Sequence, residues 1–299
     1  MISEKDVSVF NSGCDAFVNT VNCRGVMGAG IALEFKLRYP DMFEQYVKDC
    51  SDGAVRIGEL KCYKSNGDFI INFPTKDHWR EPSEIWYVEK GLDYFVNHYK
   101  EWGVKSVAIP PLGCSNGHLD FKIVRNIICS KLKDVDLDIV ICTDNKNSQG
   151  KEKEMVDNLH SCNIDFVCDY LNIRPKQKQT IISNYHKITR FFELFALEGI
   201  GEKTYGDLHN LFYREYGKCV ETEKKMVKTF NECDIFSLCG DSASKPQLKL
   251  MAACKPIERF TDISKADGVT ELAYRKVFNA VRNNSDCVKA ARTQIQTTL

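Results

Sequence analysis

The stretch Val18-Asn19-Thr20-Val21-Asn22-Cys23-Arg24-Gly25-Val26-Met27-Gly28-Ala29-Gly30-Ile31-Ala32 decides how this sequence folds. A short apolar run, Ala16-Phe17-Val18, predicts a strand leading into it. Three glycines then come within six residues, and we expect a helix to begin at about Gly30. Glycines let a backbone approach a ligand closely, and a helix N-terminus offers free N–H groups to an anion. The loop lacks the G-K-[ST] ending of a P-loop and the spacing of a dinucleotide fold. By itself it fits a phosphate site or a plain tight turn.

A second loop of the same kind lies further along the chain. Ile109-Pro110-Pro111-Leu112-Gly113-Cys114-Ser115-Asn116-Gly117-His118-Leu119-Asp120 follows an apolar run and precedes a helical pattern. Consecutive small residues can present several backbone N–H groups to an anion, and Asp120 is a suitable N-cap for the following helix. Two such loops at neighbouring strand ends could hold both phosphates of a diphosphate.

The surrounding pattern predicts an α/β domain. Apolar runs at 69–73, 106–109 and 137–141 are mostly unbroken, as in strands that are covered on both faces. Apolar residues at helical spacing occupy 85–99 and 121–132. This alternation predicts a mostly parallel sheet flanked by helices, with a ligand crevice beyond the C-terminal ends of the strands. We expect functional loops after Thr20, Phe73, Ile109 and Cys142. Residues 164–167 are a possible last strand.

Length and composition favour two domains. The chain has 299 residues, of which 43% are hydrophobic, and it contains no apolar run long enough for a membrane span. Its N-terminus lacks the apolar centre of a signal peptide. The 14 cysteines are spread evenly, which favours reduced thiols and a cytoplasmic location. Residues 174–179 read as a linker, no internal repeat is evident, and the helical part beyond is enriched in basic residues.

These motifs resemble those of the macrodomain family. The N-T-V-N segment ending at Asn22, the G-V-M-G-x-G-I-A loop and the P-P-L-G-C loop are that family's ligand-binding marks. The sequence of the first loop, together with N-F-P-T-K-x-H-W from Asn72 to Trp79, most resembles the corresponding sequences of the DNA ADP-ribosyl glycohydrolase antitoxins. The resemblance implies a macrodomain over residues 1–172. Residues 173–299 would be a smaller, mainly helical domain that binds a partner or DNA.

The resemblance also implies roles for matching positions. Lys76 would be the catalytic residue, Asn22 would hold the distal ribose, and the two loops would wrap the diphosphate. The full predicted set of ADP-ribose-binding residues is Ser8, Val9, Asn22, Val26, Met27, Gly28, Gly30, Ile31, Leu112, Gly113, Cys114, Ser115, Gly117, His118 and Leu119.

This sequence departs from the family's pattern at two places. The family often has a Gly-Asp pair on its first strand, whose Asp binds adenine. Here Ser8 stands at the aligned position with Asp6 nearby, which leaves the adenine contact open. Gly117 stands where the protein-directed relatives have a catalytic Asp. A mechanism that depends on a lysine alone, as in the DNA-directed branch, is the one compatible with this sequence.

A lysine suits the chemistry that the resemblance implies. A neutral amine can attack the anomeric carbon of the distal ribose or act as a base, but free lysine has a pKa of about 10.4, which burial or a nearby cation must lower. His78 and Arg80 are close to Lys76 in sequence. The alternative interpretation of Lys76 is an ordinary lysine in a solvated loop, without a catalytic role.

Trp79 and Trp86 could stack on a base or pack in a core. We expect Cys114 to line the anion site, not to act as a nucleophile, and His118 to hydrogen-bond within its loop.

The predicted function is removal of ADP-ribose from a macromolecule, with thymidine-linked ADP-ribose on DNA as the favoured substrate. The protein would act as the antitoxin to an ADP-ribosyltransferase toxin. A reader that binds ADP-ribose without catalysis, and a phosphatase or deacylase of a small ADP-ribose derivative, are the alternatives. Lys76 argues against the reader, because binding alone does not need it. We expect no cofactor, no metal and no membrane association.

Overall fold

The computed structural model describes residues 1–65, 67–143 and 148–285, which form two compact units. The first unit comprises Met1–Val156 and Ile188–Ala196, and the second comprises Asp157–Lys187 and Leu197–Leu299. This division differs from the predicted boundary at residue 172. A short segment of the helical half, Ile188–Ala196, belongs structurally to the first unit.

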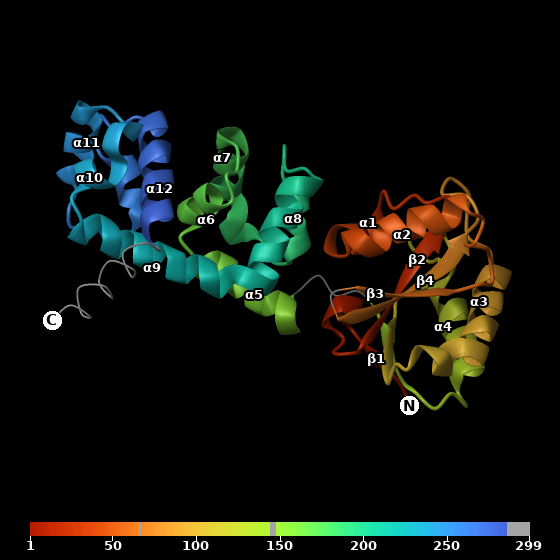
Figure 1. The fold of residues 1–299 in the computed structure, drawn as a ribbon. Helices are drawn as coiled ribbons and strands as arrows, with labels where there is room; N and C mark the ends of the chain where they lie inside the picture. Colours follow the sequence, from red (N-terminus) through yellow and green to blue (C-terminus); the bar gives the residue numbers. More distant parts are fainter. Residues whose placement is uncertain (66, 144–147, 286–299) are drawn as a thin grey trace. The chain divides into compact units, whose positions relative to one another are not determined.

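The first unit is built around one mixed sheet (Figure 1). Within the described residues its strand order is β1-β6-β5-β2-β4-β3, and every pairing is parallel except that of β3 with β4. The sheet is therefore mostly parallel, as the strand–helix alternation predicts. The strands are β1 (Ile2–Lys5), β2 (Ala16–Asn22), β3 (Lys61–Ser65), β4 (Asp68–Lys76), β5 (Ser106–Ile109) and β6 (Asp138–Cys142).

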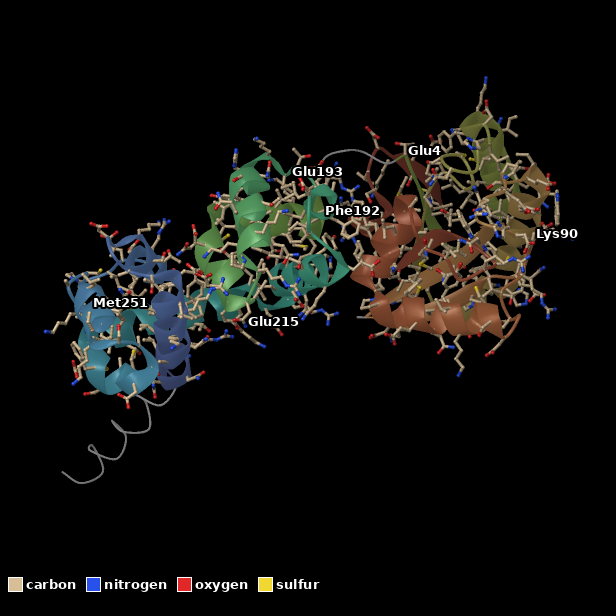
Figure 2. The ribbon with its side chains drawn as sticks, turned by 90° about the horizontal axis from the view of Figure 1, so that it is seen from above. Glu4, Lys90, Phe192, Glu193, Glu215 and Met251 are labelled. Carbon is tan, nitrogen blue, oxygen red and sulfur yellow. The ribbon has the colours of Figure 1, made fainter. Side chains whose placement is uncertain are left out.

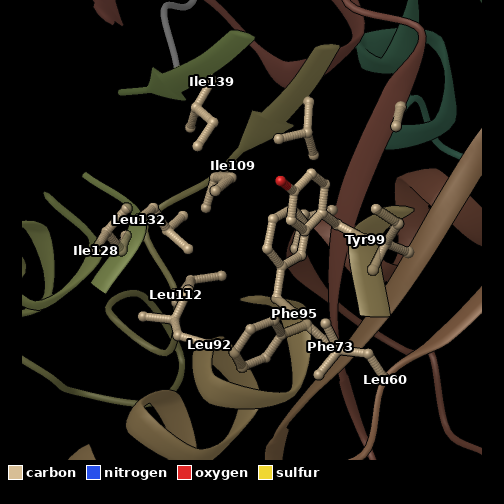
Figure 3. Packing of buried hydrophobic residues seen from close by; sticks show 14 of the residues in the cluster. Leu60, Phe73, Leu92, Phe95, Tyr99, Ile109, Leu112, Ile128, Leu132 and Ile139 are labelled. Atoms are coloured by element: carbon tan, nitrogen blue, oxygen red, sulfur yellow. The ribbon is translucent and has the colours of Figure 1, made fainter. Parts of the chain in front are cut away.

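Helices cover both faces of this sheet. The helices of the unit are α1 (Gly30–Arg38), α2 (Pro40–Ser51), α3 (Ile85–His98) and α4 (Phe121–Leu132), with short 3-10 turns η1 (Val9–Asn11) and η2 (Tyr99–Trp102). Phe73 of the sheet packs with Leu92 and Phe95 of α3 in one buried cluster, part of which Figure 3 shows. Phe35 and Tyr46 belong to a second cluster, which α1 and α2 form against the other face.

Local signals in the sequence explain several of these boundaries. Helix α1 begins at Gly30, as predicted. Helix α4 begins directly after Asp120, whose carboxylate accepts hydrogen bonds from the N–H groups of Lys122 and Ile123 at 2.7 and 3.2 Å. The predicted N-cap role of Asp120 is therefore confirmed. The cap fixes where the second glycine-containing loop ends.

The rest of the described chain is helical. Its helices are α5 (Gly150–Ser161), α6 (Ile164–Tyr170), α7 (Pro175–Asn184), α8 (Glu202–Asn210), α9 (Tyr216–Glu232), α10 (Ile235–Cys239), α11 (Lys245–Ala252) and α12 (Glu271–Ser285). Shorter turns are η3 (Tyr185–Lys187), η4 (Phe191–Ala196), η5 (Leu211–Glu215), η6 (Gly240–Ser242) and η7 (Phe260–Lys265). No helix in the described ranges is both long and apolar enough to cross a membrane.

Two predictions for this region were wrong. Residues 164–167 lie in helix α6, not in a strand, because the Asn163 side chain caps this segment by accepting from the N–H of Phe166. The predicted linker at 174–179 lies mostly in helix α7, which has a proline in its first turn. Proline fits there because the first helical N–H groups have no partner within the helix.

The helical half contains one arrangement twice, which corrects the expectation that the chain has no repeat. The succession α5, α6, α7, η4, α8 is followed by α9, α10, α11, η7, α12. Glu152-Lys153-Glu154-Met155-Val156 in α5 matches Glu223-Lys224-Lys225-Met226-Val227 in α9. Arg190-Phe191 at the start of η4 matches Arg259-Phe260 at the start of η7. We call these two parts the first and the second repeat.

Equivalent hydrogen bonds confirm that the repeat is structural. Gln177 donates to the carbonyl of Gly199 at 2.7 Å, and Gln247 donates to the carbonyl of Gly268 at 2.8 Å. Asp234 caps α10 as Asn163 caps α6. Few identities connect the repeats, and some equivalent positions, such as Leu194 and Ile263, share only apolar character. The sequence pattern alone is therefore weak evidence for the repeat.

The described cysteines form no disulfide. Cys142 and Cys168 are buried within the packed interior. Burial also raises the pKa of the Cys62 thiol to about 11. These side chains behave as small apolar groups.

Candidate functional site

A cavity of about 880 Å³ opens at the C-terminal ends of the strands of the first unit. Its wall includes Asn22 at the end of β2, Lys76 at the end of β4, and Cys142 at the end of β6. Parallel strands bring their following loops to one edge of a sheet, which is where ligands bind in such folds. The cavity is therefore at the place that the sequence pattern predicts.

The first glycine-containing loop is shaped by Asn22. Its side-chain amide donates to the carbonyl of Val26 at 2.6 Å, and its side-chain oxygen accepts from the N–H of Arg24 at 2.9 Å. The hydroxyl of buried Tyr46 donates to the Asn22 carbonyl at 2.6 Å. Asn22 thus fixes the loop as well as lining the cavity.

The two glycine-containing loops meet at Gly30 and Asn116. Gly30 has a φ of +58°, and a Cβ on it would lie 3.2 Å from the side-chain nitrogen of Asn116. A side chain at Gly30 would therefore strain the backbone and would require the Asn116 side chain to shift. Gly30 also begins α1, whose first N–H groups lack partners within the helix. The meeting point combines free N–H groups with close backbone approach, which suits an anion.

Lys76 lies beside this meeting point. Its ammonium group donates to the backbone carbonyl of Asn116 at 2.7 Å. Partial burial lowers the pKa of Lys76 below its ordinary value. Arg80 lies on the same cavity wall. The arrangement places an amine with a lowered pKa next to a loop junction whose geometry suits an anion, and such an amine can act as a base or a nucleophile.

Comparisons with known proteins identify this unit. The family model of the Macro domain matches residues 18–128. A DNA ADP-ribosyl glycohydrolase of Mycobacterium tuberculosis is 44% identical over 146 residues, which are 47% of this chain and 42% of that protein. The solved structure of the macrodomain of Mycobacterium tuberculosis DarG is 43% identical, with 48% of this chain and 99% of that chain covered and a TM-score of 0.47. Residues 18–128 of this chain therefore match the Macro domain family.

Other relatives are similar over the same part. A DNA ADP-ribosyl glycohydrolase of Thermus aquaticus is 46% identical over 123 residues, which are 40% of this chain and 34% of that protein. A DNA ADP-ribosyl transferase-DNA ADP-ribosyl glycohydrolase fusion protein of Thermosipho africanus is 31% identical over 152 residues, which are 44% of this chain and 39% of that protein. The chain thus spans about two fifths of the length of the curated relatives it matches.

Most of the predicted site residues meet at the macrodomain cavity. The catalytic candidate and ten of the predicted ligand residues line it, namely Lys76, Ser8, Val9, Asn22, Val26, Gly28, Gly30, Ile31, Gly113, Ser115 and Gly117. Within the described ranges, no three His, Cys, Asp or Glu side chains gather in a group that could hold a metal ion.

Five predicted ligand residues do not line the cavity. Met27 and Leu112 are apolar side chains in the two buried clusters, with 2% and 0% of their surface exposed. Leu119 and Cys114 pack against the cluster of Leu112, and the Cys114 thiol donates to the Leu112 carbonyl. His118 is exposed with a φ of +64°. The glycines of these loops face the cavity, while their apolar neighbours anchor the loops in the core.

The two tryptophans of the region differ. Trp79 and Trp86 are each 43% exposed, so neither is a core residue. Trp79 lines the cavity and stacks with His78, with Arg80 over its ring. Trp86 is not part of the wall and donates to Glu84 at 2.6 Å. Of the two, Trp79 is placed to contact a bound base.

Several residues that line the cavity were not among the site residues predicted from the sequence. Arg190 and Phe192 come from the segment Ile188–Ala196 and line the same cavity as Ser8 and Thr143. No motif of the macrodomain includes them. The repeat supplies the one signal that could have drawn attention to Arg190, because Arg259 occupies the equivalent position in the second repeat.

Replacing Gly117 with alanine is expected to distort the second loop. A Cβ at Gly117 would overlap the Gly113 carbonyl oxygen and the Ser83 hydroxyl, and the N–H of Ser83 donates to the Gly117 carbonyl at 3.0 Å. Such overpacking costs about 1–3 kcal/mol of unfolding free energy. We expect the affinity for ADP-ribose to fall at least about tenfold, measured by calorimetry.

A matched glycine provides the control for this variant. A Cβ added at Gly206 in α8 would meet no atom within 4 Å, so Gly206→Ala should leave ADP-ribose binding unchanged and keep the protein at least as stable. Unchanged binding in Gly117→Ala would mean that this loop does not contact the ligand.

Proposed function

We propose that this protein is a DNA ADP-ribosyl glycohydrolase, which hydrolyses the bond between ADP-ribose and a thymidine base of DNA. The position of Lys76 carries the proposal. Its amine has a lowered pKa and lies 2.7 Å from the carbonyl of Asn116, at the point where the two anion-binding loops meet. The 44% identity to a relative named DNA ADP-ribosyl glycohydrolase supports this substrate.

The cavity suggests how the ligand would lie. The first loop, from Val26 to Ile31, and the second loop, from Gly113 to Gly117, would hold the diphosphate between them. Asn22 would contact the distal ribose, whose anomeric carbon would then face Lys76. The neutral amine would attack that carbon and displace the thymidine base, and water would then hydrolyse the ribosyl–lysine bond. Alternatively, the amine would take a proton from a water molecule that attacks the carbon and displaces the base. The water hydroxyl ends on the ribose, and the base nitrogen of thymidine recovers a proton.

Gly117 supports a mechanism that depends on the lysine. The protein-directed relatives that the sequence resembles use an Asp at this position. Here any Cβ at Gly117 would overlap the Gly113 carbonyl and the Ser83 hydroxyl, so the loop as folded has no room for a carboxylate. Lys76 is therefore the group that we propose for the chemistry.

The same proposal includes a partner and a location. The Thermosipho africanus relative is named a fusion of a DNA ADP-ribosyl transferase with a glycohydrolase, which supports pairing with a transferase toxin. The helical repeats would then bind that toxin or the DNA. The cysteines of the described ranges form no disulfide, which suits a reducing compartment, so we propose that the activity is in the cytoplasm.

The test is release of ADP-ribose from a single-stranded oligonucleotide that carries ADP-ribose on thymidine. The intact chain should release free ADP-ribose and restore the unmodified oligonucleotide, with an ADP-ribosylated protein as the parallel substrate. If neither substrate is cleaved while ADP-ribose binds at micromolar concentration, the protein is a reader. Cleavage of the protein substrate alone would overturn the DNA assignment.

The pH dependence of this reaction is a separate expectation. The neutral form of Lys76 becomes more abundant as pH rises, so the rate should increase with pH and level off above the lysine's pKa. Because burial lowers that pKa, the plateau should begin below the pH at which a free lysine, with a pKa of about 10.4, loses its proton. Initial rates from about pH 6 to about pH 10 measure this. A rate that falls as pH rises would contradict a neutral amine.

A further inference from the structure

We propose that the segment Ile188–Ala196, which belongs to the first helical repeat, supplies the wall against which the adenosine end of ADP-ribose packs, with Phe192 as the contacting aromatic. The inference rests on the proposed function, because it takes ADP-ribose as the ligand. It assigns to the helical half of the chain a part in ligand binding that the macrodomain motifs do not contain.

The order of the strands places the two ends of the ligand. Lys76 ends β4, while the two anion-binding loops follow β2 and β5 in the middle of the sheet. Ser8 follows β1 and Thr143 follows β6, at the opposite edge, and both line the cavity. A ligand with its diphosphate at the loops and its distal ribose at Lys76 therefore extends its adenosine toward Ser8 and Thr143.

The segment is fastened at that same end. Arg190 donates to the Ser8 hydroxyl at 3.4 Å and to the carboxylates of Glu34 and Glu152 at 2.9 and 3.2 Å. The N–H of Phe191 donates to Glu152 at 3.1 Å, and the Phe191 ring is fully buried. Arg190 is thus a positioning residue, since its donors are directed at protein acceptors. The segment is held firmly enough to act as a wall.

Phe192 is the residue of the segment that reaches the cavity with an aromatic ring. It lines the cavity next to Arg190, and Figure 2 labels it on the segment together with Glu193. Its ring is also 6.2 Å from that of Phe195, measured between the ring centroids. Purines stack favourably on aromatic side chains. An adenine base is therefore the group that this wall fits.

The second repeat shows that the repeat's own fold does not require this ring. There Arg259-Phe260 occupies the place of Arg190-Phe191, and Phe260 is buried like Phe191. The backbone of Phe260 lies beside the Glu223 carboxylate, and the N–H of Phe191 donates to Glu152 in the first repeat. The positions of Phe192 and Phe195, however, are taken by Thr261 and Ser264.

This comparison supplies the variants for the test. Phe192→Thr and Phe195→Ser each introduce the residue that the second repeat carries, and both remove an aromatic ring from the same segment. Only Phe192 lines the cavity. Calorimetry on the full chain should show ADP-ribose binding about tenfold weaker in Phe192→Thr and within about twofold of the unchanged protein in Phe195→Ser. Thermal unfolding without ligand checks that both variants fold.

The outcomes separate this inference from the proposed function. If the unchanged protein binds ADP-ribose and Phe192→Thr binds it equally well, Phe192 is not part of the wall, and the glycohydrolase proposal stands. Equal weakening in both variants would mean that the segment acts through its folding and would also overturn the inference. If the unchanged protein does not bind ADP-ribose, the proposed function fails together with it.

Discussion

Replacing Lys76 with alanine is expected to lower the rate of ADP-ribose release from modified DNA by at least about 100-fold, the lower end of what a positioned proton-transfer group contributes. The amine lies at the cavity wall and donates to the Asn116 carbonyl at 2.7 Å. Alanine removes the proposed reacting group but no part of either glycine-containing loop. Affinity for ADP-ribose should therefore change much less than the rate, and calorimetry on the same variant measures this.

Two further lysine variants separate chemistry from charge. Lys76→Arg keeps a positive donor near Asn116, but a guanidinium stays protonated at every accessible pH. If the reaction needs a neutral amine, the Lys76→Arg variant should be as inactive as the Lys76→Ala variant. Lys90, labelled in Figure 2, is an exposed lysine of α3 that does not line the cavity, so Lys90→Ala should retain full activity.

A result in which Lys76→Arg keeps most of the activity would identify Lys76 as a cation that stabilises negative charge. In that case the rate would also lose its expected rise with pH. Full activity in Lys76→Ala would mean that another group does the chemistry. Because Arg80 lies on the same wall, it would be the next residue to replace.

The macrodomain could be predicted from sequence because its signals are local. Unbroken apolar runs gave the four central strands, and Asp120 marked the start of α4 through an N-cap whose hydrogen bonds span only three residues. The loops could be found because glycine is needed where a backbone takes positive φ or approaches closely, as at Gly30. The edge strands β1 and β3 were missed. Both are short, β1 is largely exposed, and β3 is only partly buried, so neither forms a clear apolar run.

The helical half was harder because its signals are ambiguous. Short apolar runs such as 164–167 fit a strand or a buried helix equally well, and the Asn163 cap decided for a helix. Within the loops, sequence could not tell which neighbours face the ligand. Met27 and Leu112 adjoin cavity residues in the chain, but their apolar side chains turn into the core.

Contacts between distant parts of the chain could not be predicted at all. Glu34, Glu152 and Arg190 look like solvated surface residues in the sequence, but they form one buried ion-pair cluster with Arg38. Which charges pair depends on the folded arrangement of α1, α5 and the segment Ile188–Ala196. The part of the cavity wall formed by Phe192 depends on that cluster, so it was equally hidden.

Replacing Glu152 with alanine is expected to destabilise the first unit by about 3–5 kcal/mol, the usual cost of removing one partner from a buried ion pair. The Glu152 side chain is 1% exposed and accepts from Arg38 and from Arg190, each at 3.2 Å. Burial acts to raise its pKa, but the two guanidiniums outweigh burial and hold it below the ordinary value, so it is charged at neutral pH. Urea unfolding of the full chain, followed through the transition of the first unit, measures the loss.

Glu154 is the matched control, since it lies two residues further along α5 and pairs with Lys151 at 2.9 Å with 59% of its side chain exposed. An exposed pair of this kind contributes at most about 1 kcal/mol, so Glu154→Ala should be nearly neutral. The large loss in Glu152→Ala arises because Arg38 and Arg190 would then share the single carboxylate of Glu34 in a buried place. A loss no greater than that of Glu154→Ala would mean that the apolar burial of Phe191 and Leu194, and not the ion pairs, holds the segment on the macrodomain.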